Sequence, residues 1–224
     1  KGLLYYPFAQ IVKPEGPSEG TYANGYPKGC VVHFTAGRDA TEADARNSLD
    51  WGHRQGWNFF VITPEGRTLQ SLPLNKWAHH AGVSKWPGLG RGVSRHLVGI
   101  EVACAGTVEK KASGKWKPWF NAEYAADEVR TVNGTNHGCQ TGTFRKFRPA
   151  QEEELVDLIC WLKFNNPEVF DFDLVLGHHE VSGMQGLGYW RKPDPGGSLS
   201  MSMSDFRTHL SQEYENRYSA IVLP

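Results

Sequence analysis

The stretch "HLVGIEVAC", residues 96–104, decides the fold of this chain, because it is an apolar run interrupted by a single carboxylate. A short run of aliphatic and β-branched residues predicts a buried strand. Two further stretches have a similar character, "CVVHF" at residues 30–34 and "FDLVLG" at residues 172–177. Together the three stretches predict three buried strands.

Helical patterns alternate with these strands. Residues 41–54 begin with a capping-box-like spacing of Thr and Asp, residues 149–166 start with a proline and repeat apolar residues at helical spacing, and residues 204–218 predict a capped terminal helix. Residues 57–73 contain two strand-like runs around a Pro-Glu-Gly turn, which predicts a hairpin. The fold class that follows is α/β, with a single central mixed sheet flanked by helices.

The length of 224 residues suits one well-cored domain that spans residues 1–224. Repeated Pro and Gly in residues 1–29 predict an N-terminal arm that extends over the surface. A polar stretch with several Lys and Gly residues, at 105–148, breaks the alternation of strands and helices. We interpret this stretch as an insertion on the core of the domain.

The charge and the cysteines narrow the class of protein. The 24 basic and 24 acidic residues give a net charge of zero, which argues against strong electrostatic binding to nucleic acid or to an anionic membrane surface. The apolar runs are far shorter than the roughly 20 residues of a spanning helix, so we expect no membrane insertion. The four cysteines form no CxxC pair, which indicates buried or free thiols and leaves the compartment open. We expect a monomer.

Two of the nine histidines lie at the ends of predicted strands, where α/β folds tend to place their sites. His33 follows "CVV", His178 follows "LVLG", and Asp194 comes from the stiff loop "RKPDPGG". Two imidazoles and one carboxylate leave a fourth tetrahedral position for water, which is typical of a catalytic zinc site. The segment "HHEVSGM" has no second histidine at the spacing of a helical HExxH protease, so that class is not expected.

Glu101 and Lys192 are the candidates for the remaining chemistry. Hydrolysis at a metal site needs a base, and the developing oxyanion needs a positive partner. Glu101 is the carboxylate of "VGIEVA", and Lys192 lies two residues before Asp194 in a stretch stiffened by proline. The alternative for Glu101 is an edge-strand residue that faces water, and the sequence leaves this alternative open.

Four ordered motifs resemble a known family. The motifs "VVHFTAG", "EGRTLQSLPLNKWAHHAGVS", "VGIEVACAG" and "GHHEVS" followed by "RKPDPG" are similar to those of the zinc-dependent N-acetylmuramoyl-L-alanine amidases of the type-2 class. The resemblance covers about residues 30–197 and implies the fold that these amidases share with peptidoglycan-recognition proteins. It also implies one Zn²⁺ per chain and these roles: His33, His178 and Asp194 as zinc ligands, Glu101 and Lys192 as catalytic residues, and His80 as a substrate-binding residue that lines the cleft.

The chain departs from the family pattern at some positions and leaves a choice at others. The aspartate at position 194 places it in the branch with Asp as the third ligand, where other branches carry cysteine. Trp57 stands where phage members of the family carry a catalytic tyrosine. We prefer His178 to its neighbour His179 as the ligand, because His178 directly follows the glycine that ends the predicted strand.

Aromatic and basic residues beside the motifs are candidates for substrate binding, namely Trp77, Trp190 and Arg191. Core packing is the alternative for the two tryptophans, since Trp is highly buried on average. In the insertion, "KKASGKWKPWF" at residues 110–120 joins four lysines to three aromatic residues. Aromatic faces against sugar rings and cations against stem-peptide carboxylates would both suit polymeric peptidoglycan.

The resemblance implies an enzyme that hydrolyses the amide bond between N-acetylmuramic acid and L-alanine, with peptidoglycan or a soluble muropeptide as its substrate. The alternative is a non-catalytic recognition module that binds peptidoglycan on the same fold. Such modules typically lack a metal ligand, whereas this chain keeps the complete set. The expected setting is the cell wall, reached by secretion, in the periplasm or by phage delivery, and a cytoplasmic role in recycling wall fragments stays open.

Overall fold

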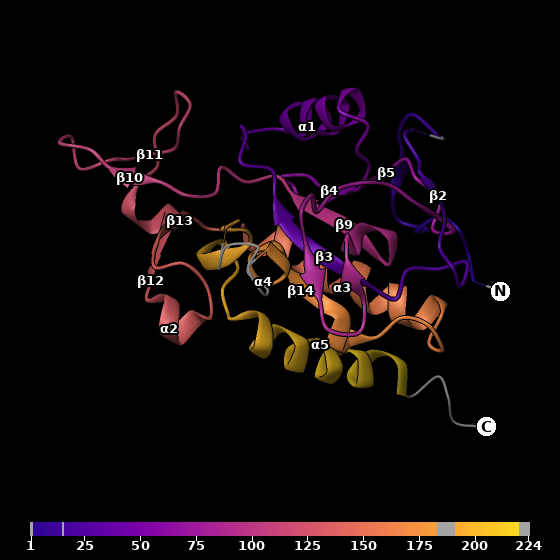
Figure 1. Cartoon of the computed structure of the whole chain (residues 1–224). Coiled ribbons are helices and arrows are strands. Elements are labelled where there is room, and N and C mark those ends of the chain that lie inside the picture. Colours follow the sequence, from indigo (N-terminus) through magenta and orange to yellow (C-terminus); the bar gives the residue numbers. More distant parts are fainter. Residues whose placement is uncertain (1, 15, 183–190, 220–224) are drawn as a thin grey trace.

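A six-stranded mixed sheet forms the centre of the computed structural model, which describes residues 2–14, 16–182 and 191–219 (Figure 1). Its strand order is β1-β5-β4-β9-β3-β14. β4 and β5 pair antiparallel, as the predicted hairpin, and the other neighbours in the sheet are parallel. The strands are β1 (Gln10–Ile11), β3 (Gly29–Phe34), β4 (Phe60–Ile62), β5 (Thr68–Gln70), β9 (Leu97–Val102) and β14 (Val175–Gly177).

Helices cover both faces of this sheet (Figure 1). On one face, α1 (Glu42–Arg54) packs its buried Ala45 and Leu49 against β4. On the opposite face, α3 (Pro149–Asn165) and α5 (Met203–Tyr218) share a core with alternate residues of β3 and β9. The mixed α/β sheet flanked by helices that the sequence predicts is thus confirmed.

The predicted elements differ from the observed ones by one to three residues at their ends, and two of these differences are informative. Residues 172–177 start as a 3-10 turn, η3 (Phe172–Leu174), and strand pairing begins only at β14. The terminal helix begins one residue earlier than predicted, because Ser202 caps it by accepting a hydrogen bond from the backbone N–H of Asp205 at 3.1 Å. The remaining short elements are α2 (Gly134–His137), α4 (His178–Ser182), η1 (Val93–Arg95), η2 (Ala126–Glu128), η4 (Gly196–Ser198) and the β7 (Lys85–Trp86) and β8 (Gly90–Arg91) pair.

The N-terminal segment, residues 1–29, contributes more than the surface arm that its Pro and Gly content predicts. β1 forms the edge of the main sheet by parallel pairing with β5. β2 (Gly20–Thr21) pairs with β6 (Lys76–Trp77). Tyr6 and Tyr26 are buried in the main core, and the Tyr26 hydroxyl donates to the carbonyl oxygen of Leu162 in α3 at 2.9 Å. These buried rings anchor the segment to the domain.

The cysteines are buried and free, as the sequence indicates. They are Cys30, Cys104, Cys139 and Cys160. All four belong to the main apolar core, and Cys160 lies within α3. Among the described residues, no helix combines the length and apolar character that a membrane span requires.

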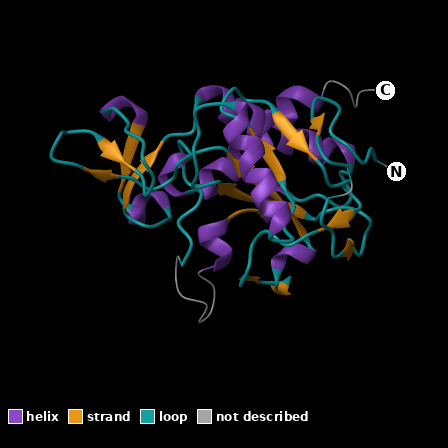
Figure 2. Ribbon diagram, turned by 90° about the horizontal axis from the view of Figure 1, so that it is seen from above, coloured by secondary structure: helices purple, strands orange, loops and turns teal. Residues whose placement is uncertain are grey.

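The insertion at residues 105–148 is a folded lobe beside the body of the domain (Figures 1 and 2). It contains two antiparallel hairpins, β10 (Glu109–Lys110) with β11 (Trp116–Lys117) and β12 (Val129–Val132) with β13 (Gly142–Arg145). A separate apolar cluster holds the lobe together, with these members: Ala105, Val108, Tyr124 and Val129, and Trp116, Phe120 and Ala122 packed against them. The lobe therefore has its own packing and is not a long irregular loop.

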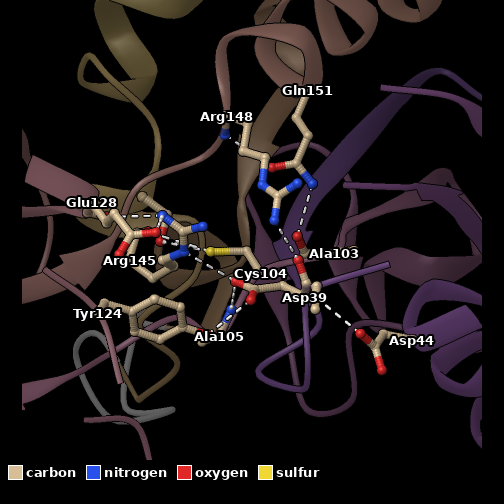
Figure 3. A network of polar contacts seen from close by, with 12 residues as sticks. Asp39, Asp44, Ala103, Cys104, Ala105, Tyr124, Glu128, Arg145, Arg148 and Gln151 are labelled. Carbon is tan, nitrogen blue, oxygen red and sulfur yellow. Dashed lines mark hydrogen bonds and ion pairs between the residues drawn. The ribbon is translucent and has the colours of Figure 1, made fainter. Parts of the chain in front are cut away.

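A buried aspartate fixes the lobe to the body, as Figure 3 shows. The Asp39 carboxylate accepts hydrogen bonds from the Ala105 backbone N–H at 3.1 Å, the Tyr124 hydroxyl at 2.8 Å and Arg145 Nε at 3.3 Å. Arg148, at the start of α3, donates to the carbonyl oxygen of Asp39 at 2.9 Å. Because Asp39 belongs to the loop between β3 and α1, these contacts hold that loop, the lobe and α3 together.

Replacing Asp39 by Asn should lower the free energy of unfolding by about 1.5–3 kcal/mol, because the buried guanidinium of Arg145 loses the nearer of its two carboxylate partners and keeps only the more exposed Glu128. Urea unfolding measures this change. Glu109→Gln is the control, since its ion pair with Lys111 is exposed and such pairs contribute about 0–1 kcal/mol. Equal stability of the two variants would show that Asp39 does not anchor the lobe.

Candidate active site

Neighbouring parallel strands bring the predicted site residues to one edge of the sheet. His33 in β3 and Glu101 in β9 are register partners, and His178 directly follows β14, which pairs with β3 on its other side. The carboxyl ends of parallel strands are where α/β folds place their sites. β9 lies between β4 and β3, so Glu101 is not an edge-strand residue, and that alternative is wrong.

The three predicted ligands meet in a buried cluster. Nδ1 of His33 lies 3.0 Å from Nδ1 of His178 and 2.9 Å from Oδ2 of Asp194, and Nδ1 of His178 lies 3.0 Å from the same oxygen. His179 takes a different position, since its Nδ1 donates to the backbone carbonyl oxygen of Asp194 at 3.0 Å. His178 is therefore the histidine at the cluster, and His179 supports the loop that carries the aspartate.

Backbone carbonyls behind the cluster determine which ring nitrogens carry protons. His80 Nε2 lies 2.8 Å from the carbonyl oxygen of Leu97, which can only accept, so Nε2 carries the proton. Burial and the neighbouring His33 hold the pKa of His80 well below its usual range, so its Nδ1 is bare. That Nδ1 lies 3.1 Å from Nε2 of His33, which must donate to it. His178 Nε2 likewise donates to the carbonyl oxygen of Ala81 at 3.0 Å.

In their neutral forms, both histidines therefore direct a bare Nδ1 toward the Asp194 carboxylate. Burial, followed by the neighbouring His178, lowers the pKa of His33 to about 4. Burial alone would raise the pKa of Asp194, but the two imidazoles outweigh it and hold that pKa below its usual value. Three lone-pair-bearing atoms about 3 Å apart repel one another unless a cation lies among them. The spacing is close to the roughly 3.3 Å between ligand atoms around tetrahedral zinc, and the donor set suits that metal.

Two residues of the motif "HHAGVS" support the two histidines of the cluster. The side chain of His80 holds His33, and the carbonyl of the next residue, Ala81, holds His178. The ring of His80 packs directly on β9 at Gly99, where an added Cβ would come within 2.6 Å of Cγ of the ring. Only glycine at this position lets the ring approach the strand, which accounts for the glycine in "VGIEV" two residues before Glu101.

Glu101 has the features of a proton-transfer group. Its Oε1 lies 3.9 Å from Nδ1 of His33, and its buried Oε2 has no hydrogen-bond partner among the described residues. Burial and then the nearby Asp194 raise the pKa of Glu101 well above its usual value, while the charge of Lys192 lowers it. A buried carboxyl with one unpaired oxygen and a raised pKa beside a cleft is typical of a catalytic acid or base.

The other predicted site residues lie further from the cluster. Lys192 has an exposed side chain, and its backbone N–H donates to Oγ of Ser182 at 3.0 Å. Arg191 is exposed, and its Nη2 donates to the carbonyl oxygen of Val83 at 2.7 Å. Trp77 is half-buried, with the guanidinium of Arg95 5.8 Å from its ring. Trp190 lies outside the described residues.

A cavity of about 590 Å³ opens beside Glu101. Its walls are the loop at 35–38, the outer face of α1 and the tip of the insertion, and its aromatic members are Trp51, Trp57, Phe59, Trp119 and Phe120. The aromatic residues of the insertion stand out in the sequence, but Trp51 does not. Its spacing could have indicated a role, because Trp51 lies in the predicted helix 41–54 and a second tryptophan, Trp57, follows six residues later.

A site that can hold a divalent cation beside a proton-accepting carboxylate suits the hydrolysis of an unactivated bond such as an amide, so the site is that of a hydrolase. Residues 23–197 match the family model described as N-acetylmuramoyl-L-alanine amidase, and this span contains every predicted site residue. The chain therefore belongs to the N-acetylmuramoyl-L-alanine amidase family. No protein of curated function matches its sequence.

Solved structures agree on the fold. A selenomethionine derivative of AmpD has a TM-score of 0.52 at 18% identity, with 91% of this chain and 95% of that chain covered. AmpDh3 from Pseudomonas aeruginosa has a TM-score of 0.53 at 16% identity, with 98% of this chain and 74% of that chain covered. At these low identities the likeness extends to the fold alone.

Replacing His80 by Ala should weaken the affinity for zinc about 10-fold to 100-fold, the usual effect of losing the hydrogen-bond partner of a metal-binding histidine. Titration of the metal-free protein with zinc, in competition with a chromophoric chelator, measures this affinity. His79→Ala is a matched control, because the neighbouring side chain is 52% exposed and its Nε2 lies 4.0 Å from Oε1 of Glu19. An unchanged zinc affinity in His80→Ala would show that His33 needs no such support.

Proposed function

We propose that the protein is a zinc-dependent amidase that hydrolyses the bond between N-acetylmuramic acid and L-alanine in peptidoglycan or in muropeptides. The observation that carries this proposal is the position of Glu101, whose Oε1 lies 3.9 Å from the ligand atom of His33. The family supports the amide as the bond attacked. AmpDh3 has been solved in complex with an anhydromuramic pentapeptide, and we extend that class of ligand to this chain.

His33, His178 and Asp194 would hold the zinc ion through two neutral imidazoles and one ionised carboxylate. Bound there, zinc supplies polarisation of the scissile carbonyl and a lowered pKa for a water molecule. His80 and the Ala81 carbonyl keep the two imidazoles in the tautomer that binds metal. The protein thus prepares the ligand atoms before the metal arrives.

Glu101 is the group that moves the proton. Its carboxylate accepts a proton from the attacking water as the water oxygen bonds to the carbonyl carbon. It then gives this proton to the alanine nitrogen as the carbon–nitrogen bond breaks, so that the leaving group departs as an amine. The raised pKa of Glu101 allows it to hold the proton between the two steps.

Lys192 is our candidate for stabilising the oxyanion. Burial raises the pKa of Glu101 and the charge of Lys192 opposes this effect, whereas burial lowers the pKa of His33 and the charge of Lys192 adds to the lowering. A cation near the reacting carbonyl would offset the negative charge that develops on the carbonyl oxygen. We further propose that the enzyme acts as a monomer on material of the cell wall.

Replacing Glu101 by Gln should lower kcat about 100-fold or more, the usual scale for losing a general base. Zinc content should stay at the wild-type level. The melting temperature should not fall, because the variant removes a buried carboxylate with an unpaired oxygen. Digestion of purified sacculi and of soluble muropeptides, followed by mass spectrometry, measures turnover and identifies the bond. Wild-type turnover in Glu101→Gln would exclude Glu101 as the base, and wild-type protein that binds sacculi without cutting them would favour a recognition module.

Replacing Asp194 by Ala should reduce the zinc content from about one per chain to a small fraction of that value, because only two ligands remain. The melting temperature should fall as well, since metal binding contributes to folding. Elemental analysis of protein purified without chelator, together with calorimetry, tests both statements. The control is Asp173→Ala, which changes an exposed aspartate outside the cluster. A metal-free but fully active wild type would overturn the zinc proposal.

A further inference from the structure

The cavity beside Glu101 has exposed aromatic walls. Trp51 is 50% exposed, Trp57 38% and Trp119 81%. Trp51 and Trp57 meet edge to face with ring centroids 5.1 Å apart, and Trp119 and Phe120 do so at 5.4 Å. One pair comes from the body and the other from the insertion, yet all four rings line the same cavity. Large aromatic side chains that converge while exposed are typical of a binding surface.

A second cavity, of about 500 Å³, lies in the insertion, and Trp119 lines both cavities. The second cavity has polar walls that include Thr107, Thr141 and Thr143. Trp119 therefore stands between an aromatic cavity at the catalytic carboxylate and a cavity rich in hydroxyl groups further out. A ligand that occupies both must be extended and must pass Trp119.

The charges around the second cavity are already paired. Lys111 Nζ lies 3.3 Å from Oε2 of Glu109, and Lys117 Nζ lies 3.0 Å from Oε1 of Glu123. These pairs leave the walls of the second cavity with little net charge. An uncharged ligand with apolar ring faces and many hydroxyls suits such walls better than a charged peptide does.

We propose that the two cavities together bind the glycan strand of peptidoglycan, and that Trp119 stacks on a sugar ring between them. The proposal rests on the proposed amidase function, because Glu101 connects the first cavity to the scissile bond. The sugar that carries this bond occupies the first cavity, and the following sugars extend over Trp119 into the second. The stem peptide then leaves the site on the side of Arg191 and Lys192, whose charges suit its carboxylates.

Trp119 also has a structural contact that the test must separate from stacking. Its Nε1 donates to the carbonyl oxygen of Ala36 at 2.6 Å, in the loop after β3. Ala36 has a φ of 53°, a conformation that costs a non-glycine residue energy and is common at functional sites. Trp119→Phe keeps an aromatic face and loses this hydrogen bond, whereas Trp119→Ala loses both.

Binding without cleavage provides the direct test, with the uncharged sugar oligomer tetra-N-acetylchitotetraose as the probe. Isothermal titration calorimetry should detect binding by the wild type, binding about ten-fold or more weaker in Trp119→Ala, and a smaller loss in Trp119→Phe. Phe8→Ala should bind like the wild type, because Phe8 is 78% exposed and lies outside both cavities. No binding by the wild type at millimolar probe, or equal losses in the two Trp119 variants, would overturn the proposal.

A cleavage assay then distinguishes glycan from peptide. Muropeptides with the same stem peptide on two or on four sugars should differ in kcat/KM for the wild type, with the longer glycan preferred, and this preference should disappear in Trp119→Ala. If the decrease of kcat/KM in Trp119→Ala depends on the length of the stem peptide instead, the cavities bind peptide and the proposal is wrong. If the wild type binds the chitotetraose but cleaves neither substrate, the amidase function falls while the glycan site stands.

Discussion

The parallel pairing of β3 with β9 and with β14 is the constraint on which the site depends. The pairing with β9 sets His33 opposite Glu101. The pairing with β14 sets Val32 opposite Gly177, the residue before His178. A shift of one residue in either register would turn a functional side chain to the opposite face of the sheet, where α3 and α5 pack. The apolar side chains that alternate with the functional ones hold the register, because they fill the core on that opposite face. Core packing and catalytic geometry are therefore fixed by the same hydrogen-bonded pairs of strands.

The protein keeps several unfavourable groups at this edge of the sheet and compensates for them nearby. Glu101 has a buried oxygen without a partner in the part of the chain that the structure describes, and the cluster places two bare imidazole nitrogens beside a carboxylate. Each such group costs stability in a dry interior. His80, itself held by the carbonyl of Leu97, and the carbonyl of Ala81 offset part of this cost by accepting hydrogen bonds from the other ring nitrogens of His33 and His178. A bound cation would offset the rest, which is how metal binding becomes part of the folding free energy.

The sequence was sufficient for the features that depend on local pattern. Apolar runs predicted the central strands, the Pro-Glu-Gly turn predicted the hairpin, and the positions of His33 and His178 at strand ends predicted where ligands would meet. The chemistry of metal-assisted hydrolysis pointed to Glu101 and Lys192, and the family resemblance added His80. What the sequence could not predict depends on distant contacts. Trp116 and Trp119 lie three residues apart in one polar stretch, yet one packs inside the lobe and the other is exposed at a cavity. The burial of Tyr6 and Tyr26, like the supporting position of His80, likewise follows from tertiary packing rather than from a periodic pattern.

The loop between β3 and α1 connects the metal cluster, the insertion and the cavity. It starts directly after the strand that carries His33, lines the cavity through residues 35–38, and ends at Asp39, whose carboxylate holds the lobe. The lobe holds the loop a second time, through the hydrogen bond from Trp119 to Ala36. Because the loop is held at two points by a lobe with its own core, both walls of the cavity are ordered before a ligand arrives. Such preorganisation lowers the entropy cost of binding an extended substrate. The insertion supplies none of the three predicted metal ligands, yet it forms one wall of the cavity that we propose as the binding site.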